Sequence, residues 1–212
     1  MGSAYIYSEE RTGYANMKLN LGCGHIRKEG YVNVDKVKND GVDVAWDLDI
    51  FPYPFDGGSV EEIVADNVLE HVNDPLATMI ELHRILKDGG RLTVKVPHFS
   101  RGFTCVDHKR GFDVTFPYYF SHLYKENVGV WFEVKTIRIS WFYANEIKRS
   151  ELNPAIFYTL IGIGYCLDFF ANLSRHFCSR IWCYWVGGFD TIDFEFIKLK
   201  SIKVGPLKEA AQ

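Results

Sequence analysis

Short apolar stretches separated by turns fill the first half of the chain. Residues 19–21, 31–34 and 42–48 place apolar side chains at every second position, and the RLTVKVP run at 91–97 does the same. Residues 61–69 carry Ile63 and Val64 into a polar tip. This alternation is typical of β-strands, because successive side chains of a strand point to opposite faces of the sheet. The first half therefore predicts five short strands.

One helix is predicted between the last two of these strands. Asp74 followed by Pro75 is a favourable helix start, since Asp caps free backbone N–H groups and Pro suits the first turn. Lys87 and the Gly89-Gly90 pair mark its end. Apolar or aromatic side chains follow at spacings of three and four, which predicts one buried face: Leu76, Met79, Ile80, His83 and Leu86.

The second half has a different pattern. Residues 98–130 look like a loop with a helix near 117–126, and residues 131–143 and 192–204 each read as a strand, the latter with a bulge at Phe196-Ile197. Between these strands lies the aromatic segment 145–190. We expect the two strands to pair and the segment between them to form helices over the sheet edge.

Together these elements predict a single α/β domain over residues 1–212. The fold is expected to be Rossmann-like, with a mostly parallel sheet, an antiparallel C-terminal strand and a helical lid inserted before the last strand. Residues 17–97 would form the core of the domain, 98–130 a loop and helix beside it, and 145–190 an aromatic helical lid.

Composition narrows the class of protein. Hydrophobic residues make up 47% and charged residues 24% of the 212 positions, which suits a folded globular protein, and the net charge of −3 favours no nucleic-acid partner. The five cysteines form no CxxC pair, so we expect free thiols in a reducing compartment and no metal site. The N-terminus lacks the pattern of a signal peptide, which favours a cytoplasmic protein.

Polar groups follow four predicted strands in succession. The Gly22-Cys23-Gly24 turn follows the first strand, Asp35 ends the second, Asp47-Leu48 end the third and Asp66-Asn67 end the fourth. Glycines allow a ligand to approach the backbone closely, and an acid at the second strand can accept the hydroxyls of a ribose. In open α/β sheets such strand ends share one edge, so these residues predict a nucleotide-like ligand site there.

At these positions the sequence resembles the class I S-adenosylmethionine-dependent methyltransferases over about residues 17–100, and more loosely along the whole chain. LNLGCG at 19–24 resembles their first motif, NVD at 33–35 the ribose-binding acid and WDL at 46–48 the adenine-contacting pair. Residues 51–72, with the LEH signature, and residues 81–98 resemble the fourth strand and the helix and strand that follow. The GYVNVD run at 30–35 is similar to a methyltransferase-11-like branch associated with glycan and cell-envelope pathways.

The resemblance implies S-adenosylmethionine as cofactor and a set of binding residues. Leu21, Gly22 and Gly24 would offer backbone near the methionine moiety, and Asp35 would hold the ribose. Asp47 and the Leu48 amide would meet the adenine, and Asp66 and Asn67 would lie near the transferring end. Asn20 stands where the family usually has an acid, and His25 follows Gly24 where a third glycine is usual, so Asn20 is the weaker candidate.

The run after the fifth strand, PHFSRGFTCVDHKRGF, is the richest nearby source of acid–base groups. We expect His108, oriented by Asp107, to act as the base, with His98 as a further catalytic candidate and Arg110 facing the acceptor. His71 in the LEHV run is an alternative base or a residue that hydrogen-bonds at the helix start. His83 is expected in the core, and Cys23 is not expected to be a nucleophile.

The favoured function is methyl transfer to an oxygen, less readily a nitrogen, of a small-molecule or glycan acceptor. Two alternatives stay open: a nicotinamide-dependent oxidoreductase, and a non-catalytic cofactor-binding subunit. Residues 153–173 form an apolar stretch that reads as a lid helix, a helix at a membrane surface that meets a lipid-linked acceptor, or a membrane span. The sequence does not define the oligomeric state.

Overall fold

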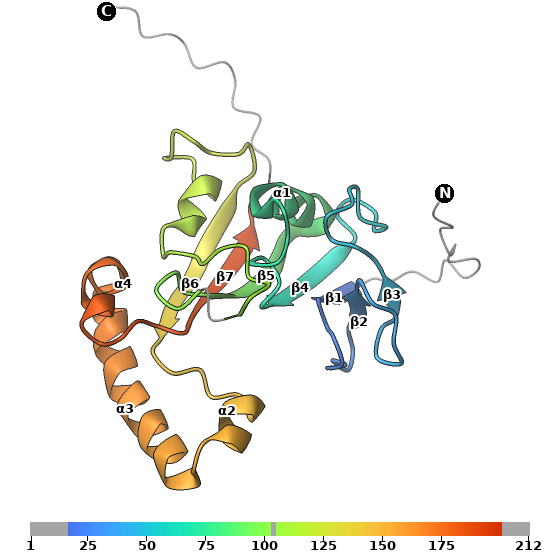
Figure 1. Cartoon of the computed structure of the whole chain (residues 1–212). Helices are drawn as coiled ribbons and strands as arrows, with labels where there is room; N and C mark the ends of the chain where they lie inside the picture. Colours follow the sequence, from blue (N-terminus) through green and yellow to red (C-terminus); the bar gives the residue numbers. More distant parts are fainter. Residues whose placement is uncertain (1–16, 103–104, 201–212) are drawn as a thin grey trace, which may run out of the picture.

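The computed structural model describes residues 17–102 and 105–200, and its centre is one seven-stranded sheet (Figure 1). The strand order is β3-β2-β1-β4-β5-β7-β6. β7 runs antiparallel to both of its neighbours, whereas β1 to β5 pair in parallel, which confirms the predicted fold class. The strands are β1 Met17–Leu21, β2 Val32–Asp35, β3 Val44–Ala45, β4 Val60–Asp66, β5 Leu86–Pro97, β6 Phe132–Ser140 and β7 Thr191–Lys198.

The predicted strands are present, with shifted limits. β3 has only two residues, so most of the predicted strand 42–48 is a turn at the sheet edge. The predicted bulge in the last strand was wrong: the irregularity lies between Val134 and Thr136 of β6, while β7 pairs without a break. The predicted end of that strand, residues 201–204, lies outside the described residues, as does the N-terminal segment 1–16.

Helix α1, Pro75–Ile85, begins as predicted. The Asp74 carboxylate accepts the backbone N–H groups of Leu76 and Ala77 at 2.9 and 3.0 Å. The buried face differs in part from the prediction, because Leu82 and Ile85, together with Met79, face the sheet while Ile80 is exposed. His83 is buried, as expected.

The connections from β1 to β4 are turns, since no helix occurs among residues 22–74. Because these strands pair in parallel, each connection returns from the carboxyl end of one strand to the amino end of the next. Parallel strands are usually joined through helices. Here turns and irregular segments make the connections.

The second half carries the remaining helical elements. The helix predicted near 117–126 is only a short 3-10 turn, η1 Phe116–Phe120. The segment 145–190 is helical as expected and lies between the two pairing strands β6 and β7, as α2 Glu146–Glu151, α3 Pro154–Leu173, α4 Arg175–Arg180 and η2 Trp182–Tyr184.

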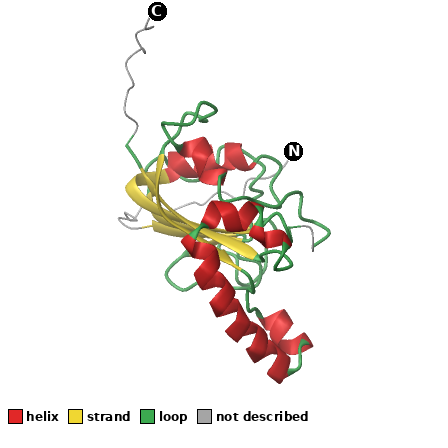
Figure 2. Ribbon diagram, turned by 90° about the vertical axis from the view of Figure 1, so that its left-hand side faces the viewer, coloured by secondary structure: helices red, strands yellow, loops and turns green. Residues whose placement is uncertain are grey.

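Helix α3 extends away from the sheet (Figures 1 and 2). It contacts the body through one stripe, in which the Asp168 carboxylate accepts the Trp141 backbone N–H at 2.6 Å and the Asn172 side chain bonds both backbone groups of Ile139. Only 22% of the residues in its most apolar 18-residue stretch are buried, although the helix is long and apolar enough to cross a membrane. Helix α3 thus forms an arm that is fixed to the end of β6, and most of the apolar surface of this arm is uncovered.

Candidate functional site

A cavity of about 520 Å³ opens where β1 to β4 end. Gly22 from the turn after β1, Asp35 from β2, Asp47 and Leu48 after β3 and Asn67 after β4 all line it. The strand ends expected to share one ligand site therefore do so. A volume of this size lies within the range that holds cofactors and small ligands.

The floor of the cavity requires glycine at position 22. Gly22 has φ +61°, and a Cβ atom there would lie 2.5 Å from Val68 Cγ2. The backbone can therefore pass beside Val68 only without a side chain. Gly24 also has a positive φ, +53°, but a Cβ atom there would meet nothing within 4 Å.

Asp35 ties the first two strand ends together. One carboxylate oxygen accepts the Gly24 backbone N–H at 2.8 Å, and the other accepts the Val37 N–H at 3.0 Å. These bonds fix the carboxylate at the cavity wall. Each oxygen keeps a further lone pair, so the group can still accept hydroxyl hydrogens from a ligand.

Asp47 is held across the cavity wall by Lys36, whose Nζ lies 2.7 Å from Asp47 Oδ2. The hydrogen bond from Lys36 lowers the pKa of the Asp47 carboxyl. Sequence reasoning did not single out Lys36, although it directly follows Asp35. Trp46, Asp49 and Val68 were also missed as lining residues.

Four predicted cofactor residues do not line the cavity: Asn20, Leu21, Gly24 and Asp66. The Asn20 amide donates to Asn33 Oδ1 at 2.9 Å, so its side chain joins β1 to β2. Leu21 is core, and the Gly24 N–H is used by Asp35. Asp66 pairs instead with Lys95, 3.1 Å away.

The far end of the cavity is formed by His71, Val72, Asp107 and Lys109. His71 Nδ1 lies 3.3 Å from Asp107 Oδ2 and the same distance from the Asp107 carbonyl oxygen. Asp107 belongs to the segment after β5 and His71 to the loop after β4. The predicted partner of Asp107 was His108, but the structure pairs it with His71.

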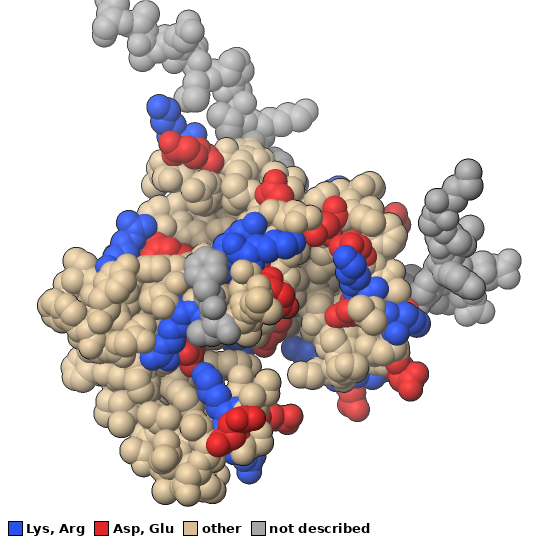
Figure 3. Space-filling view, viewed as in Figure 1, with Lys and Arg blue, Asp and Glu red and all other residues tan. Residues whose placement is uncertain are grey.

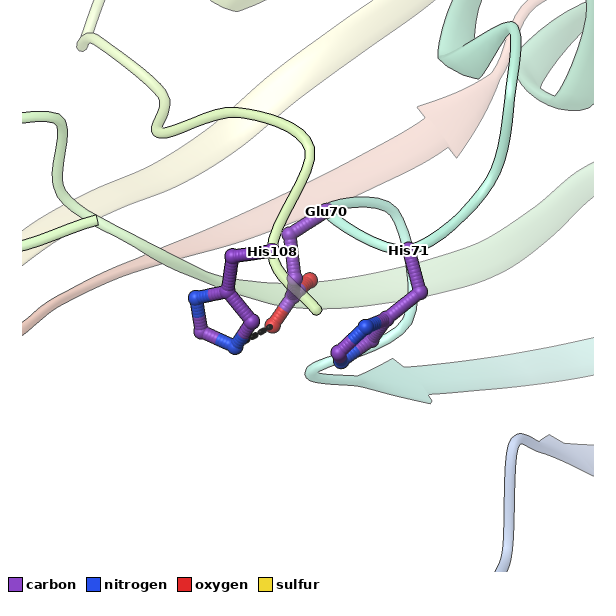
Figure 4. Close-up of side chains that lie close together, drawn as sticks. All are labelled: Glu70, His71 and His108. Carbon is purple, nitrogen blue, oxygen red and sulfur yellow. Dashed lines mark ion pairs between the residues drawn. The ribbon is translucent and has the colours of Figure 1, made fainter. Parts of the chain in front are cut away.

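His108 does not line the cavity and lies beside Glu70 (Figure 4). Its Nδ1 is 2.7 Å from the Gly102 carbonyl oxygen and its Nε2 is 3.9 Å from Glu70 Oε1. Glu70 is fully buried, and burial raises the pKa of its carboxyl to about 7. Sequence reasoning missed Glu70, because a glutamate beside a helix start usually faces solvent.

Arg110 positions this segment and does not line the cavity. Its guanidinium donates to the carbonyl oxygens of Val72 and Asn73 at 2.6 and 3.0 Å, and the Lys109 N–H donates to Glu70 O at 2.9 Å. The chain after β5 is thereby fastened to the loop after β4. The expectation that Arg110 faces the acceptor is not supported.

His98 does not line the cavity. It is fully buried, and its ring nitrogens lie 2.7 Å from Ser100 Oγ and 2.8 Å from Ser179 Oγ. Burial lowers its pKa to about 4. A catalytic role for His98 was therefore the wrong interpretation, because the ring joins the segment after β5 to α4.

The helical segment 145–190 also stays away from the cavity, since it contributes none of the lining residues. The interpretation of this segment as a lid over the site is not supported. In Figure 3 charged side chains surround the β1–β3 part of the molecule, whereas the surface over α3 is mainly uncharged. Cys23 is buried, which raises the pKa of its thiol and argues against a nucleophilic role.

The residues at the cavity fit an adenosyl sulfonium ligand. Four aspartates and two lysines line it, so carboxylates outnumber cations where a positively charged ligand would bind: Asp35, Asp47, Asp49 and Asp107 against Lys36 and Lys109. Leu48, Val68 and Trp46 supply apolar surface for a base. The backbone at Gly22 leaves space for close approach.

Comparison with known proteins finds a family match over part of the chain and similar folds. Residues 29–94 match the profile of a family described as a methyltransferase domain. The chain is similar to a Bacillus halodurans structure provisionally assigned as a methyltransferase, with a TM-score of 0.51 and 15% identity over 88% of this chain and 94% of that one. It is also similar to a Galdieria sulphuraria structure provisionally assigned as a sarcosine dimethylglycine methyltransferase, with a TM-score of 0.50 and 18% identity over 89% and 80%.

A curated relative is an uncharacterised 37.1 kDa protein in transposon TN4556 of Streptomyces fradiae. It is 41% identical over 52 residues, which span 24% of this chain and 15% of that protein. The family match covers about a third of this chain, and the similar structures share its fold. The cofactor expected for such a domain is S-adenosylmethionine.

Replacing Gly22 with Ala should destabilise the fold more than replacing Gly24. Both variants place a side chain at positive φ, which costs about 1–2 kcal/mol, but only Gly22→Ala adds a clash with Val68. Urea unfolding of the two variants and wild type measures the difference. Equal losses of unfolding free energy would show that Val68 moves aside freely.

The His98 ring should make the fold sensitive to acid. The unfolded state takes up a proton near pH 6.5 and the folded state only near pH 4, so stability from this residue is lost as pH falls between these values. The loss amounts to about 3 kcal/mol for a shift of this size.

The measurement is urea unfolding of wild type and His98→Asn from pH 7 to pH 4. The raised pKa of Glu70 acts in the opposite direction over this range, so the difference between the two proteins isolates His98. A difference that stays constant with pH would contradict the assignment.

Proposed function

We propose that the chain transfers a methyl group from S-adenosylmethionine to an oxygen of a small-molecule or glycan acceptor. The observation that carries this proposal is the cavity in which Gly22, Asp35 and Asp47 meet at the ends of neighbouring strands. The cofactor would lie along these residues. The acceptor would enter at the end lined by His71 and Asp107.

When bound, S-adenosylmethionine supplies a methyl group on a positively charged sulfur, which keeps the electron pair of the broken C–S bond. Asp35 would accept the ribose hydroxyls, and Asp47 with the Leu48 backbone would meet the adenine. Asn67, the only non-glycine residue of the described segments with a positive φ, lines the cavity. The chain's main contribution is alignment of the two reactants.

Transfer to a hydroxyl oxygen also requires that the acceptor lose a proton. The cavity end beside His71 and Asp107, with His108 and Glu70 directly behind, gathers the ionisable groups suited to this step. This concentration favours an oxygen acceptor over an already unprotonated amine, which needs no base. His108 remains part of the proposed catalytic group, although it does not line the cavity.

Two further features belong to this proposal. The uncovered apolar surface of α3 favours contact with a membrane surface and a lipid-linked acceptor of the glycan or cell-envelope kind. A cytoplasmic location would give the enzyme access to its cofactor.

The direct test is incubation of the purified chain with methyl-labelled S-adenosylmethionine and a panel of hydroxylated acceptors, including sugars and lipid-linked glycans. Label in an alkali-stable ether supports the proposal. Calorimetry with nicotinamide nucleotides covers the oxidoreductase alternative. Cofactor binding without transfer to any acceptor would favour a non-catalytic subunit.

Asp35→Asn should weaken S-adenosylmethionine binding by about 1.5–3 kcal/mol, because hydrogen bonds to a charged carboxylate are lost. Isothermal titration calorimetry measures the dissociation constant. Asp56→Asn, at an exposed position outside the cavity, is the matched control. An unchanged dissociation constant in Asp35→Asn would remove the ribose assignment.

His71→Ala and His108→Ala should each lower kcat about 100-fold or more, since acid–base groups typically contribute that much. The S-adenosylmethionine dissociation constant should stay within about twofold, because the cofactor contacts lie at the other end of the cavity. Normal turnover in both variants would exclude this cluster from the reaction.

A further inference from the structure

A buried carboxylate without a hydrogen-bond partner among the described residues lies beside His71, which lines the cavity. Glu70 is fully buried, and among the described residues neither of its carboxylate oxygens has a hydrogen-bond partner. Buried polar groups in native proteins are nearly always hydrogen-bonded, and an uncompensated carboxylate is costly to bury. Glu70 therefore points to a partner that the described residues do not supply.

Two imidazoles face the same point. Glu70, His71 and His108 each offer one ligand atom, and these atoms lie within 4.8 Å of one another (Figure 4). Glu70 and His71 are adjacent in the loop after β4, and His108 is brought to them from the segment after β5.

The two rings are oriented as metal-binding histidines are. His108 Nδ1 lies 2.7 Å from the Gly102 carbonyl oxygen, and His71 Nδ1 lies 3.3 Å from the carbonyl oxygen of Asp107. A ring that donates its Nδ1–H to a carbonyl keeps the Nε2 lone pair for another partner. This arrangement of a ligand histidine held by a carbonyl or carboxylate is common around metal ions.

A direct contact between His108 and Glu70 does not satisfy the carboxylate. The 3.9 Å between His108 Nε2 and Glu70 Oε1 is too long for a hydrogen bond. Ligand atoms around a tetrahedral zinc ion lie about 3.3 Å apart, given metal–ligand bonds of about 2.0–2.1 Å. The three side chains would have to close by no more than about 1.5 Å.

We propose that Glu70, His71 and His108 bind a divalent transition-metal ion of the zinc type. Two imidazoles with one carboxylate suit zinc, iron or nickel better than magnesium or calcium, which prefer oxygen ligands. His71 lines the cavity, so an ion held by these residues would lie next to it. The sequence has no cysteine spacing typical of a metal site, and it predicted no metal. Only the fold brings residue 108 close to residues 70 and 71.

The role of the ion rests on the proposed function. A bound hydroxyl group becomes more acidic on a divalent ion, which would help the acceptor oxygen lose its proton before methyl transfer. The proton would pass to solvent or to Asp107, which faces the cavity beside His71. Metal binding itself is independent of whether an acceptor is known.

The test is metal binding by the full-length chain after treatment with a chelator. Zn²⁺ titration in a calorimeter should give one site per chain, and Co²⁺ should give the visible absorption of a four- or five-coordinate ion. Glu70→Gln, His71→Ala and His108→Ala should each weaken Zn²⁺ binding at least about tenfold. Circular dichroism checks that each variant is folded.

Two matched controls sharpen the result. His122→Ala removes a histidine that stacks on Trp131 away from the cavity, and it should bind Zn²⁺ like wild type. Cys105→Ala tests the overlapping group Cys105, Asp107 and His108, and it should also leave binding unchanged. Absence of a one-to-one site, unchanged binding in Glu70→Gln, or loss of binding in Cys105→Ala would each overturn the proposal.

A parallel titration with S-adenosylmethionine separates this proposal from the proposed function. Cofactor binding by a chain that binds no Zn²⁺ would overturn the metal site alone. Zn²⁺ binding that depends on Glu70 in a chain that binds no S-adenosylmethionine would overturn the cofactor assignment and leave the metal site standing.

Discussion

The parallel pairing of β1 with both β2 and β4 is the constraint on which the site depends. It sets Leu21 beside Val34 and Ala65, so the chain turns after three strands at one level of the sheet. The Gly24 N–H then bonds the Asp35 carboxylate and closes the first turn onto the second strand. Because the intervening connections are turns and no helix intrudes, the strand ends open directly into a shared cavity.

The end of the cavity lined by His71 and Asp107 is built in another way. An isolated parallel bridge between His98 and Phe112 holds the base of the segment after β5. Hydrogen bonds from Arg110 and the Lys109 N–H to the backbone of residues 70–73 fasten this segment to the loop after β4.

Sequence patterns were informative where local rules act and weak where distant segments meet. The Asp74–Pro75 helix start, the strands and the positions of Gly22, Asp35 and Asp47 follow from periodicity and turn chemistry, and the structure confirms them. The partners of His71 and His108 could not be predicted, because they are separated by 36 and 38 residues from the groups they face. His98 was misassigned since its two serine partners, especially Ser179, come from an element far along the chain.

Helix α3 is a second case in which composition alone does not predict burial. Its composition suits a buried helix, and yet the fold covers only the stripe of Phe157, Gly164, Asp168 and Ala171. Asp168 is not a charge left in an apolar stretch, since it accepts the Trp141 N–H and anchors the arm to the end of β6. An otherwise uncharged helix that is fixed at one stripe and apolar on its remaining sides is stable in water only at a cost. Exposed apolar surface of this extent is typical of a site that another surface covers, and it lies apart from the cavity, to which α3 contributes no lining residue.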